Sequence, residues 1–407
     1  MKRRDILKSI SILPLAGGLA GSLAPVSGIF AAPKAKRNVF EELGLRTFIN
    51  AAGNYTAMSA SLMPPEVMEA INQSATEYVM LDEVQDKVGE KIAAMCHAEA
   101  AMVTAGCWSA IVLGTAGVLT GKDNEKIKRL PNLTGSGMKS EVIIQKAHLV
   151  GYEHSVTNTG AKIIVVETAD DAEKAINDKT AMMWFLNREA PLGKISHEAW
   201  LQIAKKHNIP TMIDMAADVP PVENLWKYND MGFDLVAISG GKAMCGPQST
   251  GILMGKKELI AAARLNGPPN GGNIGRGMKV NKEEIIGMYV AMDAYIKRDH
   301  RKEWKTWEDK IAFIDAAIKK IPGVTTEVFI PPVANHNPSL MIAWDPQKIK
   351  LTKETMGEKL RRGSPSIETI SWEKDNSIRI TVFMLKPGQE KMVANRIKEE
   401  LLNNSAS

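Results

Sequence analysis

The sequence predicts an α/β protein with a mostly parallel sheet covered by helices on both faces, followed by a smaller α+β C-terminal domain. Three observations lead to this fold class. Apolar runs alternate with amphipathic segments from residue 66 to about residue 300. The runs are nearly continuous in apolar residues, which is typical of parallel strands buried on both faces. Beyond residue 300, charged helical patterns and short strand patterns indicate a separate α+β unit.

Six apolar runs are the strand candidates of the larger part, because each is short and helical patterns lie between them. They are Glu141–Gln145, Lys162–Val166, Ala181–Leu186, Thr211–Asp214, Asp234–Ser239 and Thr250–Met254. Helical patterns lie around and between them. We expect helices over Trp108–Leu119 and over Ser196–Asn208, where the Ser196 hydroxyl can cap the first turn.

The smaller part has its own pattern of elements. We expect helices over Thr306–Lys320 and Gln389–Leu402 and strands near Ser339–Ala343 and Ser377–Phe383. These patterns divide the chain into a leader, a linker, a large domain with an N-terminal segment of its own, and a small domain. The corresponding ranges are 1–32, 33–45, 46–300 with the segment 46–65, and 301–407.

The first 32 residues have the three parts of a secretory signal. Residues 2–8 read KRRDILK, a weakly apolar stretch follows, and Ala31-Ala32 ends it with small residues. The paired Arg3-Arg4 fit the twin-arginine version of such a signal. We therefore expect export by the twin-arginine machinery, to the periplasm or otherwise out of the cytoplasm. A basic tail and an uncleaved anchor are the alternatives.

Composition excludes several classes of protein. Apolar residues make up 44% and charged residues 24%, so the chain is neither disordered throughout nor collagen-like. The net charge is +5, but residues 1–37 carry all of the excess and residues 38–407 sum to −1, which predicts no nucleic-acid partner. Three cysteines cannot form a disulfide framework in a chain this long, and whether Cys107 and Cys245 pair is left open. No metal site is predicted.

An ionisable residue lies at the end of one strand candidate, and another follows shortly after a second candidate. Asp214 ends one of them, and Lys242 follows another after Gly240-Gly241, 28 residues further along. A right-handed crossover places such strands at or near neighbouring positions, so both side chains should lie at the same edge of the sheet. One interpretation is a salt bridge. The other is a pyridoxal-phosphate site, in which the lysine forms an imine with the aldehyde and the carboxylate keeps the pyridine nitrogen protonated.

The neighbouring residues favour the cofactor interpretation. A long lysine side chain in a glycine-rich turn after a buried strand contributes little to packing, and Ser239 can offer a hydroxyl to a phosphate. Residues 104–109 form a glycine turn into a helix, which exposes backbone N–H groups to an anion. His148 follows the strand candidate Glu141–Gln145 and could stack on the cofactor ring, with Tyr152 as its rival for that place.

The chain resembles the fold type I pyridoxal-phosphate enzymes, more narrowly the selenocysteine-synthase-like group and within it the D-glucosaminate-6-phosphate ammonia-lyase type. The resemblance extends over roughly residues 45–300 and is loose beyond them. It rests on the segments FINAAGNYT (48–56), TAGCWSAI (104–111), IIQKAH (143–148), TMIDMAADVPP (211–221), ISGGKAMCGPQSTGILMGKKELI (238–260) and NIGRGMKVNKEEIIGMYVAM (273–292).

The resemblance implies a seven-stranded sheet of the aspartate aminotransferase type, pyridoxal 5'-phosphate as cofactor and a homodimer or larger homo-oligomer. It implies that Lys242 forms the imine, that Asp214 pairs with the pyridine nitrogen, and that Arg379 binds a substrate carboxylate. Further members of the implied site are Gly106, Cys107 and Ser239 around the phosphate and Arg276 at the active site or at the neighbouring subunit's phosphate.

These parts predict a lyase that catalyses α,β-elimination, with ammonia release, from a β-substituted amino acid or amino sugar acid. An aminotransferase or other transferase, a racemase or an aldolase remains the alternative, because the same residues support each reaction. A non-catalytic exported binding protein is a further alternative, which the presence of both Lys242 and Asp214 disfavours.

Overall fold

The computed structural model describes residues 37–371 and 375–405. Residues 37–47 belong to a separate unit from the rest of the chain, and they hold the short helix α1 (Val39–Glu42), whose N-cap is Asn38. The predicted leader 1–32 and the first residues of the predicted linker lie outside the described residues. Among the residues that are described, no helix is both long enough and apolar enough to span a membrane.

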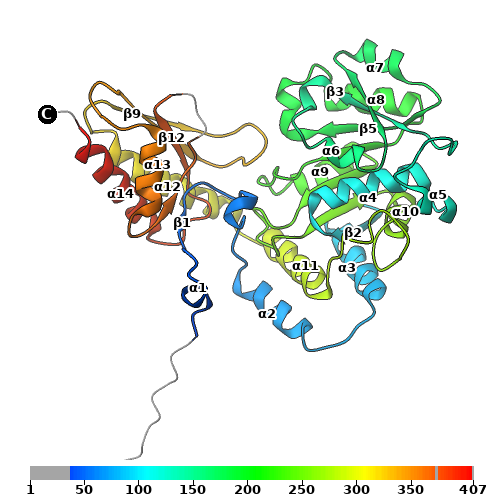
Figure 1. Ribbon diagram of the computed structural model, residues 1–407, viewed down its shortest axis with the longest axis horizontal. Coiled ribbons are helices and arrows are strands. Elements are labelled where there is room, and N and C mark those ends of the chain that lie inside the picture. The colour runs from blue at the N-terminus through cyan, green and yellow to red at the C-terminus, as the bar shows by residue number, and fades with distance from the viewer. Residues whose placement is uncertain (1–36, 372–374, 406–407) are drawn as a thin grey trace, which may run out of the picture. The chain divides into compact units, whose positions relative to one another are not determined.

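A seven-stranded sheet organises the larger part of the second unit, and it is mostly parallel, as the sequence predicts (Figure 1). The strand order is β2-β8-β7-β6-β5-β3-β4, and only β8 runs antiparallel to its neighbours. The strands are β2 (Ala100–Thr104), β3 (Glu141–Gln145), β4 (Lys162–Val166), β5 (Thr180–Leu186), β6 (Thr211–Asp214), β7 (Leu235–Ser239) and β8 (Gly251–Gly255).

The six strand candidates all form strands, with bounds that differ by at most one residue at an end. The seventh strand, β2, was not predicted. Its sequence AAMVT begins with two alanines and leads into a helix, and because alanine is the strongest helix former, the segment has no clear strand signal. It forms a strand because it pairs with β8 over its whole length.

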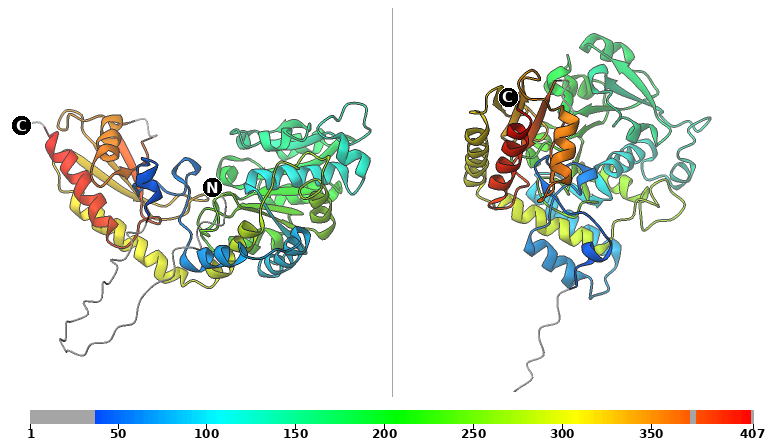
Figure 2. Two further views of the ribbon diagram at one scale, coloured as in Figure 1. Left: turned by 60° about the horizontal axis from the view of Figure 1, so that its bottom comes forward. Right: turned by 60° about the vertical axis from the view of Figure 1, so that its left-hand side comes forward.

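Both faces of this sheet are covered by helices, because successive strand residues enter two different cores (Figures 1 and 2). Ile143, Phe185 and Ile213 pack into one core, whereas Ile144 and Trp184 pack into the other. The helices of the first core are α2 (Pro65–Ser74), α3 (Leu81–Met95), α7 (Ala169–Ala175), α8 (His197–Lys206), α9 (Asn224–Met231) and α11 (Lys282–Ile296). Those of the second are α4 (Gly106–Thr120), α5 (Asn124–Arg129), α6 (His154–Thr157) and α10 (Lys257–Leu265).

The C-terminal part has a third core between helices and a three-stranded antiparallel sheet of order β12-β10-β9. Its elements are α12 (His300–Ile318), β9 (Val324–Phe329), β10 (Ser339–Trp344), α13 (Lys353–Arg362), β11 (Ile367–Glu368), β12 (Ser377–Thr381) and α14 (Gln389–Asn403). The strand β1 (Ile49–Asn50) pairs with β11, and Ile49 and Ala51 are buried in this third core. The start of the segment 46–65 therefore packs with the C-terminal part, whereas the sequence pattern had grouped it with the large domain.

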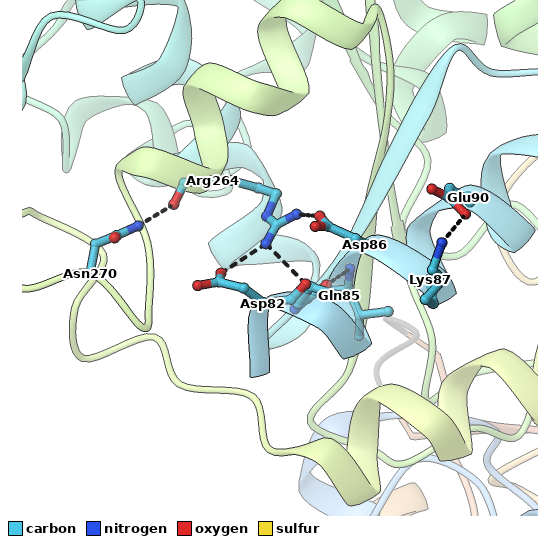
Figure 3. A network of polar contacts seen from close by, with 8 residues as sticks. Asp82, Gln85, Asp86, Lys87, Glu90, Arg264 and Asn270 are labelled. Atoms are coloured by element: carbon cyan, nitrogen blue, oxygen red, sulfur yellow. Dashed lines mark hydrogen bonds and ion pairs between the residues drawn. The ribbon is translucent and has the colours of Figure 1, made fainter. Parts of the chain in front are cut away.

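Two side chains connect the helix α3 to its neighbours, the edge strand β2 and the helix α10 (Figure 3). The Gln85 amide donates to the carbonyl of Val103 at 2.7 Å and accepts from its N–H at 3.1 Å, so it satisfies both outward backbone groups of that residue of the edge strand β2. Arg264, in the last turn of α10, is paired with Asp82 at 2.9 Å and with Asp86. These contacts tie the end of α10 and the edge strand to one helix.

Candidate active site

The carboxyl edge of the large sheet brings Asp214 and Lys242 together. Asp214 ends β6, Lys242 lies in the turn after β7, and these two strands are parallel neighbours. Both side chains line one cavity of about 120 Å³. The structure therefore satisfies the condition on which the cofactor hypothesis depends, because one flat ring could contact both groups.

Asp214 is almost completely buried, with 2% of its surface exposed. Burial raises the pKa of this carboxyl, and the Ala216 N–H, the positive charge of Lys242 and the Cys107 thiol oppose that rise. The Ala216 N–H donates to Oδ1 at 3.0 Å, and the Cys107 Sγ lies 3.5 Å from the same oxygen. The site therefore holds a carboxylate with fixed donors on one oxygen, which suits a partner for a protonated ring nitrogen.

The turn between β2 and α4 offers backbone N–H groups at the same edge. Gly106 has a φ of +87°, a conformation that favours glycine, and the N-cap residue Ala105 has no side-chain hydrogen bond to the first turn of the helix. A Cβ on Gly251 would lie 2.3 Å from the carbonyl carbon of Gly106, so β8 can pass this turn only with glycine there. Thr104, Gly251 and Ser239 are aligned across β2, β8 and β7.

These features fit pyridoxal phosphate. The first turn of α4 and the Ser239 hydroxyl would hold the phosphate, because an uncapped helix N-terminus binds anions. Lys242 and Asp214 would hold the ring from the cavity that they share. Cys107, in the same first turn, is buried and its thiol contacts Asp214, so the predicted phosphate residue also contacts the predicted partner of the ring nitrogen.

His148 lies at the predicted end of its strand, but its ring lies in the core. Its ring is completely buried and does not line the cavity of Lys242. The Nδ1 atom accepts the Leu186 N–H at 3.2 Å, the ring meets Phe185 edge-on at 4.5 Å, and burial lowers the pKa of the imidazole to about 4. Its hydrogen bond to the end of β5 draws the ring into the core. The rival candidate Tyr152 does line the cavity.

Arg276 and Arg379 are the remaining predicted site residues, and neither lines the cavity of Lys242. Arg276 is exposed in the loop between α10 and α11 and is not among the residues that line the cavity. Arg379 lies on β12, donates to the Tyr55 hydroxyl at 3.1 Å and lines a second cavity of about 300 Å³. Tyr55, Arg188 and Asn335 line both cavities, so the two are adjacent.

Sequence analysis missed two charged residues of the site. Arg188 follows the end of β5, so the inspection of strand ends that identified Asp214 could also have identified it. Asp218 lies four residues after Asp214, lines the same cavity and is 1% exposed. An acidic residue in the otherwise apolar run MAADVPP was the available signal for Asp218.

The structure contains no disulfide between Cys107 and Cys245, the pairing that the sequence left open. Cys96, Cys107 and Cys245 are all free thiols. Cys107 contacts Asp214, whereas the Cys245 thiol contacts the carbonyl of Ala243 at 3.5 Å. Burial raises the pKa of both of these thiols. Burial therefore disfavours the thiolate form of Cys107 and of Cys245.

Known proteins resemble this chain over most of its length. The aminotransferase class-V family model matches residues 148–341. The D-glucosaminate-6-phosphate ammonia lyase of Salmonella typhimurium (strain 14028s / SGSC 2262) is 27% identical, and the match covers 89% of this chain and 97% of that protein. A 5'-C-glycyluridine monooxygenase-decarboxylase of Streptomyces sp is 22% identical, with 90% of this chain and 93% of that protein covered.

A more distant relative and a solved structure are similar to this chain as well. The L-seryl-tRNA(Sec) selenium transferase of Aquifex aeolicus (strain VF5) is 25% identical over 46% of this chain and 48% of that protein. The solved structure of a D-glucosaminate-6-phosphate ammonia-lyase shares the fold, with a TM-score of 0.78 and 24% identity over 91% of this chain and 99% of that one. Together these matches support a fold type I pyridoxal-phosphate enzyme of the group that includes D-glucosaminate-6-phosphate ammonia-lyase and selenocysteine synthase.

Proposed function

We propose that the protein is an ammonia-lyase that acts on an amino acid or amino sugar acid with a leaving group on its β-carbon. The observation that carries the proposal is the cavity shared by Lys242 and Asp214, which joins an amine and a buried carboxylate at one sheet edge. The lyase named among the relatives covers nearly the whole chain and supports this reaction class.

Pyridoxal phosphate, when bound, supplies an electron sink for a bond broken at the α-carbon of an amine. Two residues of the chain would carry out the proton transfers. Lys242 has an amine that can take the α-proton at Nζ, and the adjacent glycines let its backbone approach a ligand closely. Asp214 would keep a proton on the ring nitrogen, since its carboxylate faces the cavity with little access to water.

The second cavity is the proposed place for the acidic end of the substrate. Arg379 lines it, and its guanidinium donates to Tyr55, which also borders the first cavity. A guanidinium matches the two oxygens of a carboxylate. Arg188 borders both cavities and adds a second positive charge. A substrate bound there would keep its α-carbon near Lys242.

The reaction class is tested by product analysis on the cofactor-loaded protein. Serine and β-chloroalanine, each as both enantiomers, are incubated with the protein, and ammonia and pyruvate are measured. We expect equal amounts of both, without an added acceptor. Keto acid without free ammonia, formed only when an acceptor keto acid is present, would contradict the proposal and show transamination. Inverted substrate as the only product would show racemisation.

We further propose that the protein is exported by the twin-arginine machinery. The paired arginines in KRRDILK support this, although these residues lie outside the described part of the chain. Replacing Arg3 and Arg4 by Lys should leave the protein in the cytoplasmic fraction of its host. The matched control replaces Lys34 and Lys36 by Gln, which removes charge outside the motif and should leave export intact. Export of the Arg3, Arg4 variant at the wild-type level would overturn the proposal.

We also propose a homodimer. The exposed position of Arg276 outside the cavity supports the expectation that it reaches the site of a second subunit. Sedimentation of the loaded protein tests this, and a monomer at assay concentration would overturn it.

A further inference from the structure

The cavity contains an acid that the mechanism above does not use. Asp218 lines it beside Lys242, yet only 1% of the residue is exposed. Its Oδ2 accepts a hydrogen bond from the Asn187 Nδ2 at 2.9 Å, and its backbone carbonyl accepts from the Asn224 Nδ2 at 2.6 Å. Within the described part of the chain, its Oδ1 accepts no hydrogen bond and no cation lies in ion-pair contact with it.

A buried network fixes the position of this acid. The Asn187 Nδ2 also donates to the Tyr228 hydroxyl at 2.6 Å, and the Asn187 Oδ1 lies 2.7 Å from the Nε2 atom of His197. Since the amide oxygen faces the imidazole, its NH₂ group must face Asp218 and Tyr228. The Asp218 carboxyl is therefore held by a neutral donor on one oxygen, which leaves the other for the cavity.

The surroundings of Asp218 favour its protonated form. Burial raises the pKa of the carboxyl, the Asn187 hydrogen bond opposes this, and the nearby charge of Asp214 raises the pKa further. Lys242 and Arg188 are the positive charges that face it, and they lower the pKa, which comes to about 7. An acid that is half protonated near neutral pH is well suited to give up a proton.

The other polar groups of the cavity are unsuited to supply a proton to a leaving group. Lys242 takes the α-proton and Asp214 must stay ionised. Arg188 keeps its protons, because a guanidinium is not deprotonated in proteins. The Tyr55 hydroxyl accepts the Arg379 N–H and lies beside the second cavity, on the side of the proposed carboxylate site. Tyr152 is 47% exposed and lies against the Arg188 guanidinium.

We propose that Asp218 is the general acid of the elimination and protonates the leaving group on the β-carbon. The inference rests on the proposed function. As the bond between the β-carbon and the leaving oxygen breaks, its electron pair stays on that oxygen, which takes the Asp218 proton and leaves as water. Lys242 takes the α-proton, and the electron pair of that C–H bond forms the double bond. Solvent then returns a proton to Asp218 and accepts one from Lys242, so atoms and charge balance.

The test compares two leaving groups in Asp218→Asn, which keeps the size of the side chain but has no acidic proton. Hydroxide needs a proton to leave, whereas chloride does not. We expect turnover of serine to fall by about 100-fold or more, and turnover of β-chloroalanine to change by less than about threefold. Equal losses on both substrates would overturn the proposal in favour of a positioning role. No loss on serine would also overturn it, because Lys242 would then return the proton itself.

A matched control and a pH series complete this comparison. Asp230→Asn makes the same chemical change at a half-exposed surface carboxylate paired with His97, and it should leave both substrates unaffected. In the wild type, the ratio of serine turnover to β-chloroalanine turnover should fall as the pH rises through about 7, because the acid is lost above its pKa. A ratio that is independent of pH would contradict the proposal.

Infrared spectroscopy separates this inference from the proposed function, because it needs no turnover. The difference spectrum of wild type minus Asp218→Asn should contain the C=O band of a protonated carboxylic acid at about pH 6, and this band should vanish at about pH 9. If the band is present but neither substrate reacts, the proposed reaction is wrong while the acid remains assigned. If the band is absent at about pH 6, Asp218 carries no proton to give and the inference fails.

Discussion

Replacing Lys242 by Ala should abolish ammonia release, with turnover falling by about 10³-fold or more. The residue has two proposed tasks, to bind the cofactor covalently and to take the α-proton, and alanine can do neither. Borohydride treatment followed by peptide mass analysis measures the first task directly. We expect the wild type to carry the reduced cofactor on Lys242, and we expect the variant to carry none.

Arg379→Gln is the matched comparison for this experiment. This residue lines the second cavity, so its loss should weaken substrate binding and leave cofactor attachment intact. We expect the variant to retain the label on Lys242 while its KM rises by about 10- to 100-fold, the loss of a charged hydrogen bond. Covalent label elsewhere than on Lys242, or normal turnover in Lys242→Ala, would contradict the assigned role of the lysine.

Asp214→Asn should lower turnover by about 100- to 1,000-fold while the cofactor stays bound. The amide has nearly the same shape but no charge, so it cannot keep the ring nitrogen protonated, and the electron sink weakens. Acid should have a similar effect on the wild type. Because burial raises the pKa of Asp214, protonation removes its charge at a higher pH than for an exposed carboxyl, and turnover should fall on the acid side.

Cys107→Ala separates the effect of the Asp214 charge from the effect of the thiol that contacts this carboxylate. It removes the thiol that contacts the Asp214 Oδ1 at 3.5 Å but leaves the carboxylate and its bond to the Ala216 N–H. We expect a loss of less than about tenfold, because a thiol is a weak donor. Steady-state kinetics with the absorption spectrum of the bound cofactor measures both variants. Asp214→Asn with wild-type turnover would show that this carboxylate is not the partner of the ring nitrogen.

Much of this site could be predicted because its chemistry follows the ends of strands with strong local patterns. TMID and DLVAIS are mainly apolar runs, and parallel strands bring their carboxyl ends to one edge, so the common position of Asp214 and Lys242 followed from the spacing of the strands. Arg188 follows the end of β5 and obeys the same rule. The edge strand β2 has a helix-like sequence, and only its pairing with β8 makes it a strand.

The features that the sequence did not predict depend on contacts between distant parts of the chain, which local sequence does not determine. His148 lies at the expected end of its strand, but its ring turns into the core because the Leu186 N–H, 38 residues away, donates to it. Asp218 lies in a loop, and its environment depends on Asn187 from another element. The contact of Ile49 with the C-terminal core is likewise a long-range effect, since its partner strand lies more than 300 residues later.

The amide of Gln85 has a consequence for how firmly the enzyme retains its cofactor. The strand β2 ends in the turn that offers N–H groups to an anion, and it has a strand neighbour on one side only. Outermost strands open locally more often than central ones. Local opening of this edge would disturb the backbone N–H groups that would hold the phosphate of the cofactor. Because the Gln85 amide holds Val103 in place, we expect the cofactor to dissociate faster when this side chain is removed, although α3 contributes no residue to the cavity of Lys242.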